Sequence, residues 1–222
     1  MISVNMTWTA AVFTTTAGDP LEMDGKPVKK EEMMKKDLGV MPAVFPMPVL
    51  LIAAYDEAGT VNVMNAAWGM PNADNKIALF IDKHHKTTKN ILAVKAFTVA
   101  LADVEHMKEA DYFGMVSGNK VPDKFDKSGC HAEESRVVHA PVIREFPISL
   151  ECELAEVIDT DNMFAIVGKI INASAEEELI GEDGKVDASR INALMFDQFH
   201  FDYYRAGKRV GKAFSEGRSL IR

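Results

Sequence analysis

The densest local positive charge in this chain is the run from Lys83 to Asn90, which reads KHHKTTKN. We expect it where a strand gives way to a helix, so that the free N–H groups of the first helical turn, the Thr hydroxyls and the cationic side chains could converge on one anion. The pattern is typical of a phosphate site. A solvated charge run is the other interpretation, because lysines in such runs commonly face water, and composition alone leaves the two even.

The histidines do not predict a metal site or a hydrolytic centre. His84 and His85 are adjacent, and sequence neighbours point apart on a strand or a helix, so metal ligation is not predicted. The chain has no GxSxG motif and no Ser-His-Asp or Cys-His grouping that spacing supports, so it offers no obvious nucleophile. The remaining histidines lie in separate segments and are expected at the surface or in the core: His106, His131, His139 and His200.

A second candidate segment is Asn65-Ala66-Ala67-Trp68, which ends a predicted strand with small side chains. Such a segment would let a planar ligand lie against backbone amides, and it suits a close-packed strand crossing equally well. None of the 14 glycines forms a GxGxxG fingerprint, so a Rossmann dinucleotide site is not predicted. The stretch from Gly207 to Ala213 is one residue short of a phosphate loop and has Ala213 where a metal-binding hydroxyl is required.

The two cysteines, Cys130 and Cys152, lack the spacing of zinc ligands or of a disulfide scaffold. We therefore expect a reduced, cytoplasmic protein. Cys152 falls within a predicted strand and is interpreted as a small core residue. Cys130 falls within a predicted loop and is expected to be at most an exposed thiol.

Length and charge restrict the class of protein further. With 222 residues, of which 47% are hydrophobic, the chain can bury one sizeable core, and one domain is the default. The formal net charge of -8 argues against generic binding to nucleic acid or to anionic membranes. The longest apolar stretch, around Val44 to Ala54, is interrupted by Pro46 and Pro48 and is too short to span a membrane.

The N-terminus differs in character from the rest of the chain. Residues 1–34 are predicted to form an extension that is either poorly ordered or adds a strand, and residues 35–222 are predicted to form the domain. No Lys or Arg precedes Lys26, which disfavours a signal peptide. Met33 or Met34 is an alternative natural start, which the intact mass of the native protein would test.

Periodicity predicts short strands with few helices between them. The stretches 49–55 and 60–68 read as a hairpin around a turn at 56–59. The other predicted elements are strands at 77–81, 96–102, 148–158 and 163–173, helices at 87–95 and 105–116, and loops at 119–135 and 176–187. This order favours a mainly β fold, an all-β barrel with a few decorating helices, over a doubly wound sheet.

With these segments in hand, the chain resembles the flavin reductase-like family with the FMN-binding split barrel, and most closely its flavoredoxin branch. The resemblance covers roughly residues 35–217. It rests on the order and spacing of several pieces: FPMPV at 45–49, NVMNAAW at 62–68, HKTTKNI at 85–91, EADYFGMVSG at 109–118, KF at 124–125, FPISLEC at 146–152, YY at 203–204 and GKAF at 211–214.

The resemblance implies a split-barrel homodimer that binds FMN near the subunit interface. Family members often have Thr or Ser where this chain has Asn65, and Arg where it has His85, which loses the bidentate Arg fork toward phosphate. Transferred residue by residue, the implied site has three parts: Asn65, Ala66, Ala67 and Trp68 along the isoalloxazine and ribityl chain, His85, Lys86, Thr87 and Asn90 around the phosphate, and Ser117, Gly118 and Lys124 closing it.

The activity implied by the resemblance is hydride transfer from NADH or NADPH to flavin, with electrons passing on to an acceptor protein or to free flavin. In such an enzyme the flavin carries the redox chemistry and the protein supplies position and hydrogen bonds, which accounts for the missing nucleophile. Two alternatives stay open. One is a flavoredoxin-like FMN electron carrier without direct NAD(P)H turnover, and the other is a flavin-binding module without redox turnover.

Overall fold

The computed structural model describes residues 13–14, 20–21 and 35–221. The chain divides into two compact units, residues 1–42 and 43–222. In the first, β1 (Phe13–Thr14) pairs antiparallel with β2 (Pro20–Leu21). Most of the predicted extension over residues 1–34, including the alternative starts Met33 and Met34, lies outside the described residues. Everything below concerns the second unit.

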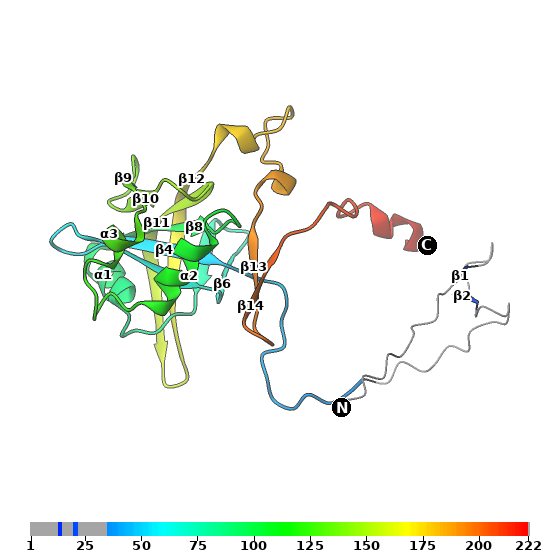
Figure 1. The fold of residues 1–222 in the computed structure, drawn as a ribbon, viewed down its shortest axis with the longest axis horizontal. Helices are drawn as coiled ribbons and strands as arrows, with labels where there is room; N and C mark the ends of the chain where they lie inside the picture. The colour runs from blue at the N-terminus through cyan, green and yellow to red at the C-terminus, as the bar shows by residue number, and fades with distance from the viewer. Residues whose placement is uncertain (1–12, 15–19, 22–34, 222) are drawn as a thin grey trace, which may run out of the picture. The chain divides into compact units, whose positions relative to one another are not determined.

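The main element of the second unit is a curled, antiparallel seven-stranded sheet. Its two edge strands, β5 and β6, are consecutive in the chain and are separated only by Ala67 and Trp68, so the sheet must curl until its edges almost meet (Figure 1). The strand order is β5 (Val61–Ala66), β4 (Leu50–Tyr55), β8 (Ala96–Leu101), β11 (Ile148–Thr160), β12 (Met163–Ala175), β7 (Lys76–Leu79) and β6 (Gly69–Pro71).

Two smaller sheets complete the strands. One has the order β14 (Asp202–Arg205), β13 (Leu194–Asp197) and β3 (Met47–Pro48), and the other pairs β10 (Pro141–Ile143) with β9 (Ala132–Glu134). Three short 3-10 helices follow β12: η1 (Glu177–Leu179), η2 (Ala188–Arg190) and η3 (Glu216–Leu220). The predicted mainly β fold is therefore confirmed, and the predicted strands all exist.

The helices lie beside β4 and β5 (Figure 1). They are α1 (Lys86–Val94), α2 (Met107–Met115) and α3 (Lys124–Ser128). The first two were predicted within two residues at each end. The third was not, because the segment 119–135 was predicted to be a loop. A five-residue helix spans little more than one turn, too little for periodicity to reveal. Among the described residues, no helix is long and apolar enough to cross a membrane.

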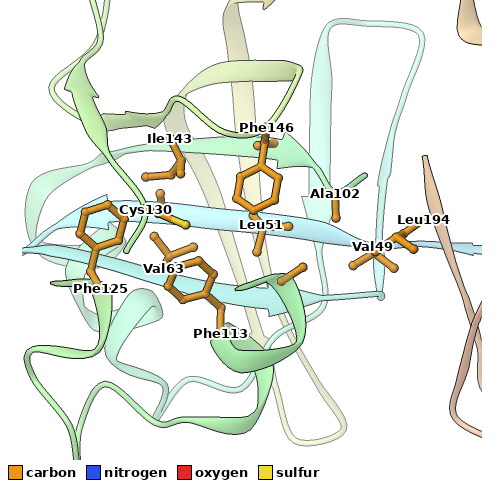
Figure 2. Close-up of a cluster of buried hydrophobic side chains, with 13 residues drawn as sticks. Val49, Leu51, Val63, Ala102, Phe113, Phe125, Cys130, Ile143, Phe146 and Leu194 are labelled. Atoms are coloured by element: carbon orange, nitrogen blue, oxygen red, sulfur yellow. The ribbon is translucent and has the colours of Figure 1, made fainter. Parts of the chain in front are cut away.

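Strand β4 is buried on both faces, so the unit has two layers of core. Leu51 and Ala53 face a cluster that includes residues of β5, α2 and α3, whereas Leu50 and Ile52 face the opposite cluster with residues of β7, β11 and β12. Figure 2 shows the first cluster, with the rings of Phe113 and Phe125 on one side of the strand. This packing holds α2 and α3 against β5.

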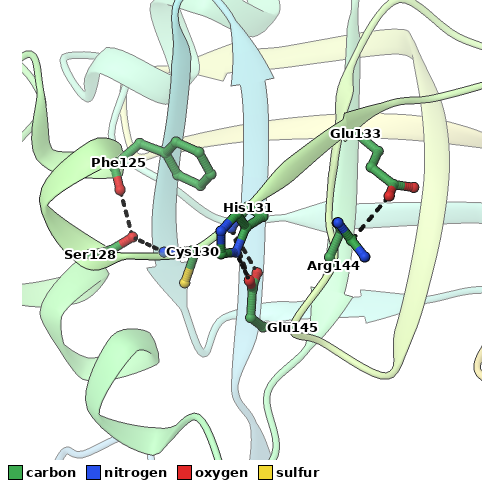
Figure 3. Close-up of polar contacts among 7 residues, drawn as sticks. All are labelled: Phe125, Ser128, Cys130, His131, Glu133, Arg144 and Glu145. Atoms are coloured by element: carbon green, nitrogen blue, oxygen red, sulfur yellow. Dashed lines mark hydrogen bonds and ion pairs between the residues drawn. The ribbon is translucent and has the colours of Figure 1, made fainter.

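The prediction of an exposed Cys130 is wrong. Its side chain is 8% exposed and belongs to the first core cluster (Figure 2). A turn after α3 directs it inward: Ser128 Oγ donates to the Phe125 carbonyl at 2.6 Å and accepts from the Cys130 amide at 3.1 Å (Figure 3). Burial raises the pKa of the Cys130 thiol. Cys152 is fully buried as predicted, and burial raises its pKa to about 12.

Next to this turn, His131 lies at the surface, as expected. Its Nδ1 is 2.7 Å from Glu145 Oε1, and its amide donates to the same carboxylate at 2.9 Å (Figure 3). Its side chain is 72% exposed. The pair therefore fastens the start of β9 to the turn before β11 rather than forming a catalytic group.

Candidate functional site

The candidate site begins at the N-terminus of α1. His85 occupies the position before the helix with extended backbone angles, φ −60° and ψ 144°, and its side chain does not cap the helix. The first turn of α1 contains no acidic residue. The amides of Lys86, Thr87 and Thr88 cannot find partners within the helix. They form a partially positive end suited to an anion.

The turn before α1 is built by Asp82. Its carboxylate accepts from the His84 amide at 2.6 Å, and its carbonyl accepts from Thr88 Oγ1 at 2.8 Å. These two contacts fix where the helix begins. They also orient α1 so that Thr87 and Thr88, on its first turn, are buried against the sheet.

Part of the charged run from Lys83 to Asn90 is a solvated surface, and part of it belongs to a candidate phosphate site. Lys83 lies 3.5 Å from Asp159 with both side chains half exposed, and Lys89 donates to Asn119 Oδ1 at 3.3 Å on the surface. Lys86 is different, because its Nζ lies 3.1 Å from Asp56 Oδ2 and its side chain is only 31% exposed. The run is therefore a solvated face at Lys83 and Lys89 and part of a pocket at Lys86.

That pocket has a volume of about 160 Å³ and lies between β5, the N-terminus of α1 and the end of α2. Asn62, Met64 and residues 113–116 contribute to its wall as well. The structure thus brings together these predicted site residues from four separate segments: Asn65, His85, Lys86, Thr87, Ser117, Gly118 and Lys124.

The four other predicted site residues do not line this pocket. Ala66 and Ala67 are buried, each 8% exposed, and Asn90 is 2% exposed within α1. Trp68 is 47% exposed, with its ring 6.2 Å from that of Phe196. The Nδ2 atom of Asn90 has no hydrogen-bond partner among the described residues.

Lys124 is a buried cation at the wall of the pocket. Its side chain is 2% exposed, and its Nζ donates to the carbonyls of Val116 at 2.8 Å and Phe113 at 3.2 Å. Among the described residues no carboxylate forms an ion pair with it. Burial lowers the pKa of Lys124 to about 8. A buried ammonium normally has a counter-charge, so an anionic ligand in the pocket would supply the charge that the described part of the chain does not.

A second charge effect concerns Lys86. Partial burial of Asp56 by itself raises the pKa of its carboxyl. Hydrogen bonds from the Thr60 amide and the Lys86 ammonium outweigh this effect, so the pKa is lowered. Asp56 is therefore ionised at neutral pH and holds Lys86 at the edge of the pocket. The Lys86 ammonium is already paired with Asp56, so an anion in the pocket would interact with a lysine that also keeps this ion pair.

Sequence reasoning missed Asn62. Its Nδ2 donates to Thr87 Oγ1 at 2.5 Å, which links β5 to α1, and its Oδ1 is buried without a partner among the described residues. A signal was present in the sequence, because alternation places Asn62 on the same side of β5 as the core residues Met64 and Ala66. A polar residue on an apolar strand face is expected to have a specific partner.

The arrangement suits the phosphate end of a ligand. It offers helix amides, a Thr hydroxyl, Lys86, and a buried lysine that has no counter-charge among the described residues. Pockets that enclose a whole organic ligand usually measure about 300–1,000 Å³, so 160 Å³ holds only part of a nucleotide. The remainder of such a ligand would extend beyond this pocket, past residues such as Met115, which is 77% exposed.

Several known proteins are similar to this chain in sequence or structure. Residues 41–203 match the family model described as flavin reductase like domain. The flavoredoxin of Desulfovibrio vulgaris (Miyazaki F) is 30% identical, with a TM-score of 0.79, covering 83% of this chain and 100% of that chain. Flavoredoxin from Methanosarcina acetivorans is 31% identical, with a TM-score of 0.74, covering 86% and 100%. An uncharacterized protein of Aquifex aeolicus (strain VF5) is 24% identical over 80% of this chain and 89% of that protein.

Proposed function

Because the chain belongs to the flavin reductase-like domain family, whose fold is the split barrel, we propose that it binds FMN and acts as an oxidoreductase of the flavin reductase type. In this proposal NADH or NADPH donates hydride to the flavin, and electrons pass on to an acceptor protein or to free flavin. The observation that carries the proposal is the pocket at the start of α1, where Lys86, Thr87 and the buried Lys124 meet.

Each wall of the pocket has a role in holding the phosphate. The amides of Lys86 and Thr87 and the Thr87 hydroxyl would donate hydrogen bonds to it. Lys86 and Lys124 would supply positive charge, and His85 lines the same pocket. Ser117 and Gly118 close the pocket, and Gly118 does so with the least bulk. Bidentate Arg recognition is replaced by these single contacts.

When bound, the flavin would supply the hydride and electron chemistry, so no side chain of the chain needs to act as nucleophile or general base. The residues of this chain hold and orient it. Asn65 is already fixed for this role, because its Nδ2 donates to the Ala110 carbonyl at 2.9 Å and so ties β5 to α2. The exposed Trp68 follows the end of the same strand by two residues.

The proposed active form is a homodimer. The pocket is too small for a whole flavin nucleotide. Exposed apolar side chains line it or follow its residue Asn65 closely in the sequence, with exposed fractions of 77% for Met115, 47% for Trp68 and 63% for Met70. Covering them with a second copy would remove apolar surface from water and would also enclose the part of the ligand that projects from the pocket.

A second candidate function is that of a flavoredoxin-like electron carrier without direct NAD(P)H turnover. The specific observation in its favour is that two flavoredoxins are 30% and 31% identical and are covered over their whole length. Such a carrier would hold FMN in the same pocket and exchange electrons with protein partners. A binding module without redox turnover is the third outcome of the experiment below.

The test is an absorbance spectrum of the purified protein with added FMN, followed by anaerobic NADH and NADPH. We expect a yellow protein whose visible absorbance bleaches with one of the two nicotinamides. Bleaching only with a reduced protein partner would identify the carrier, and tight binding without any reduction would identify the binding module. A protein that is isolated without flavin and takes up no added FMN would rule out all three.

A further inference from the structure

We infer that Asn62 reads a hydroxyl group of the ribityl chain and thereby selects flavins that carry the complete sugar-alcohol chain. This inference rests on the proposed function, because it concerns the same pocket. Asn62 lines the pocket next to Thr87, and it is the one pocket residue with a buried polar atom that has no partner among the described residues.

The unpartnered atom is a hydrogen-bond acceptor. Asn62 is 4% exposed, its Nδ2 is engaged by Thr87 Oγ1 at 2.5 Å, and its Oδ1 has no donor among the described residues. A buried carbonyl oxygen without a donor is costly, so a donor is expected when the pocket is filled. The oxygens of an ionised phosphate only accept hydrogen bonds and cannot serve. A ligand hydroxyl can donate one.

The same side chain sets the direction of the Thr87 hydroxyl. Because Thr87 Oγ1 accepts from Asn62 Nδ2, its own hydrogen is free to donate elsewhere, and Thr87 lines the pocket. Asn62 therefore prepares two different contacts. It leaves a donor at Thr87 for an anion, and its buried Oδ1 has no donor among the described residues and would be satisfied by a neighbouring ligand hydroxyl. A phosphorylated sugar alcohol carries both kinds of group.

The backbone around Gly118 keeps Asn62 in place. A Cβ atom on Gly118 would collide with Asn62 Oδ1 and would come within 3.2 Å of Lys86 Cβ. Gly118 thus lets the loop after α2 close directly over the Asn62 carboxamide.

The experiment compares FMN with its three monodeoxy analogues, which lack the 2′, 3′ or 4′ hydroxyl of the ribityl chain. Dissociation constants are measured for the native full-length protein and for Asn62→Leu, whose side chain has the same branching but is larger and has no polar atoms. We expect one analogue to bind roughly three- to tenfold more weakly than FMN to the native protein, the effect of one neutral hydrogen bond. In Asn62→Leu the same analogue and FMN should bind equally.

Two further variants separate positioning from folding. Thr87→Val keeps the shape of Thr87 but removes its hydroxyl, and it should weaken FMN and all analogues by one common factor. Asn62→Ala replaces Asn62→Leu if the larger side chain prevents folding. Asn162→Leu, at an exposed position of the β11–β12 hairpin, is the control for the substitution itself and should bind like the native protein.

The outcomes distinguish the two levels of the proposal. Native protein that binds no flavin would overturn the proposed function together with this inference. Native protein that binds FMN and all three analogues equally would overturn the inference alone, because a water molecule would then serve Asn62 Oδ1. A hydroxyl preference that persists in Asn62→Leu would also overturn it, since another residue would then read the hydroxyl.

Discussion

The ammonium group of Lys124 donates a hydrogen bond to the backbone carbonyl of Val116 at 2.8 Å. This contact joins the first residue of α3 to the segment that leads into Ser117 and Gly118. A second bond, to the Phe113 carbonyl at 3.2 Å, reaches the last turn of α2. One buried cation therefore holds together the elements that close the pocket. Its protonation should affect how the stability of the protein depends on pH.

Removing Lys124 should change how stability depends on pH in the flavin-free protein. Burial lowers its pKa from 10.5 to about 8, so between these values the unfolded chain binds more protons than the folded one. The contribution of Lys124 to the free energy of unfolding should therefore rise by about 3 kcal/mol between pH 8 and pH 10.5. Below pH 8 the buried ammonium lowers the stability of the folded protein by this full amount. Denaturant unfolding of native protein and Lys124→Met over this range measures the difference.

The matched control for that comparison is Lys120→Met, at an exposed position on the same connection. It should follow the native pH profile. If native protein and Lys124→Met show the same slope between pH 8 and 10.5, then Lys124 is not held as a buried cation in solution.

Replacing Lys86 and Thr87 together by Ala should weaken FMN binding. These residues line the pocket and would contribute charge-assisted hydrogen bonds to the phosphate. The expected loss is about 1.5–3 kcal/mol, or roughly 10- to 150-fold in the dissociation constant measured by fluorescence titration. Lys83→Ala with Lys89→Ala removes two positive charges from the solvated face, one more than the first double variant, and should still have a much smaller effect. Equal losses in the two double variants would mean that the run acts only through its general field.

Gly118→Ala should reduce both FMN affinity and stability. The added methyl group would collide with Asn62 Oδ1 and crowd Lys86 Cβ, so the loop or the carboxamide must move. Overpacking of this kind typically costs about 1–3 kcal/mol of unfolding free energy. Gly207→Ala is the matched control, because a Cβ at Gly207 would meet nothing within 4 Å. Thermal unfolding that does not distinguish the two variants would contradict the close approach at Gly118.

Both cysteines should resist labelling by a thiol reagent in the native protein. Cys130 is 8% exposed and Cys152 is fully buried, and burial raises the pKa of each thiol, so little thiolate is present and little surface is accessible. Two thiols should react after unfolding in denaturant. Rapid native labelling of Cys130, followed by mass spectrometry, would show that the turn after α3 opens in solution.

Much of the fold could be predicted because its signals are local. Alternation along 49–55 and 60–68, with turn residues between them, specified the β4–β5 hairpin, and helical spacing of Ile91, Leu92 and Val94 specified α1. Helix α3 and the burial of Cys130 could not be predicted in this way. They depend on the contact of a short segment with α2 and with β5, and β5 lies far away in the sequence.

For the candidate site, the sequence by itself determined which chemical groups are available: a charged run before a helix, small residues at the end of a strand, and two further segments that resemble one family. Only the tertiary structure decided how these groups are used. It turned Lys83 and Lys89 toward water, held Lys86 at the pocket, buried Lys124 and brought in Asn62. The physical reason is that burial and hydrogen-bond partners are set by contacts between separate segments, such as the bond from β5 to α1 and the packing of α3 with β5, and not by the residues adjacent in the chain.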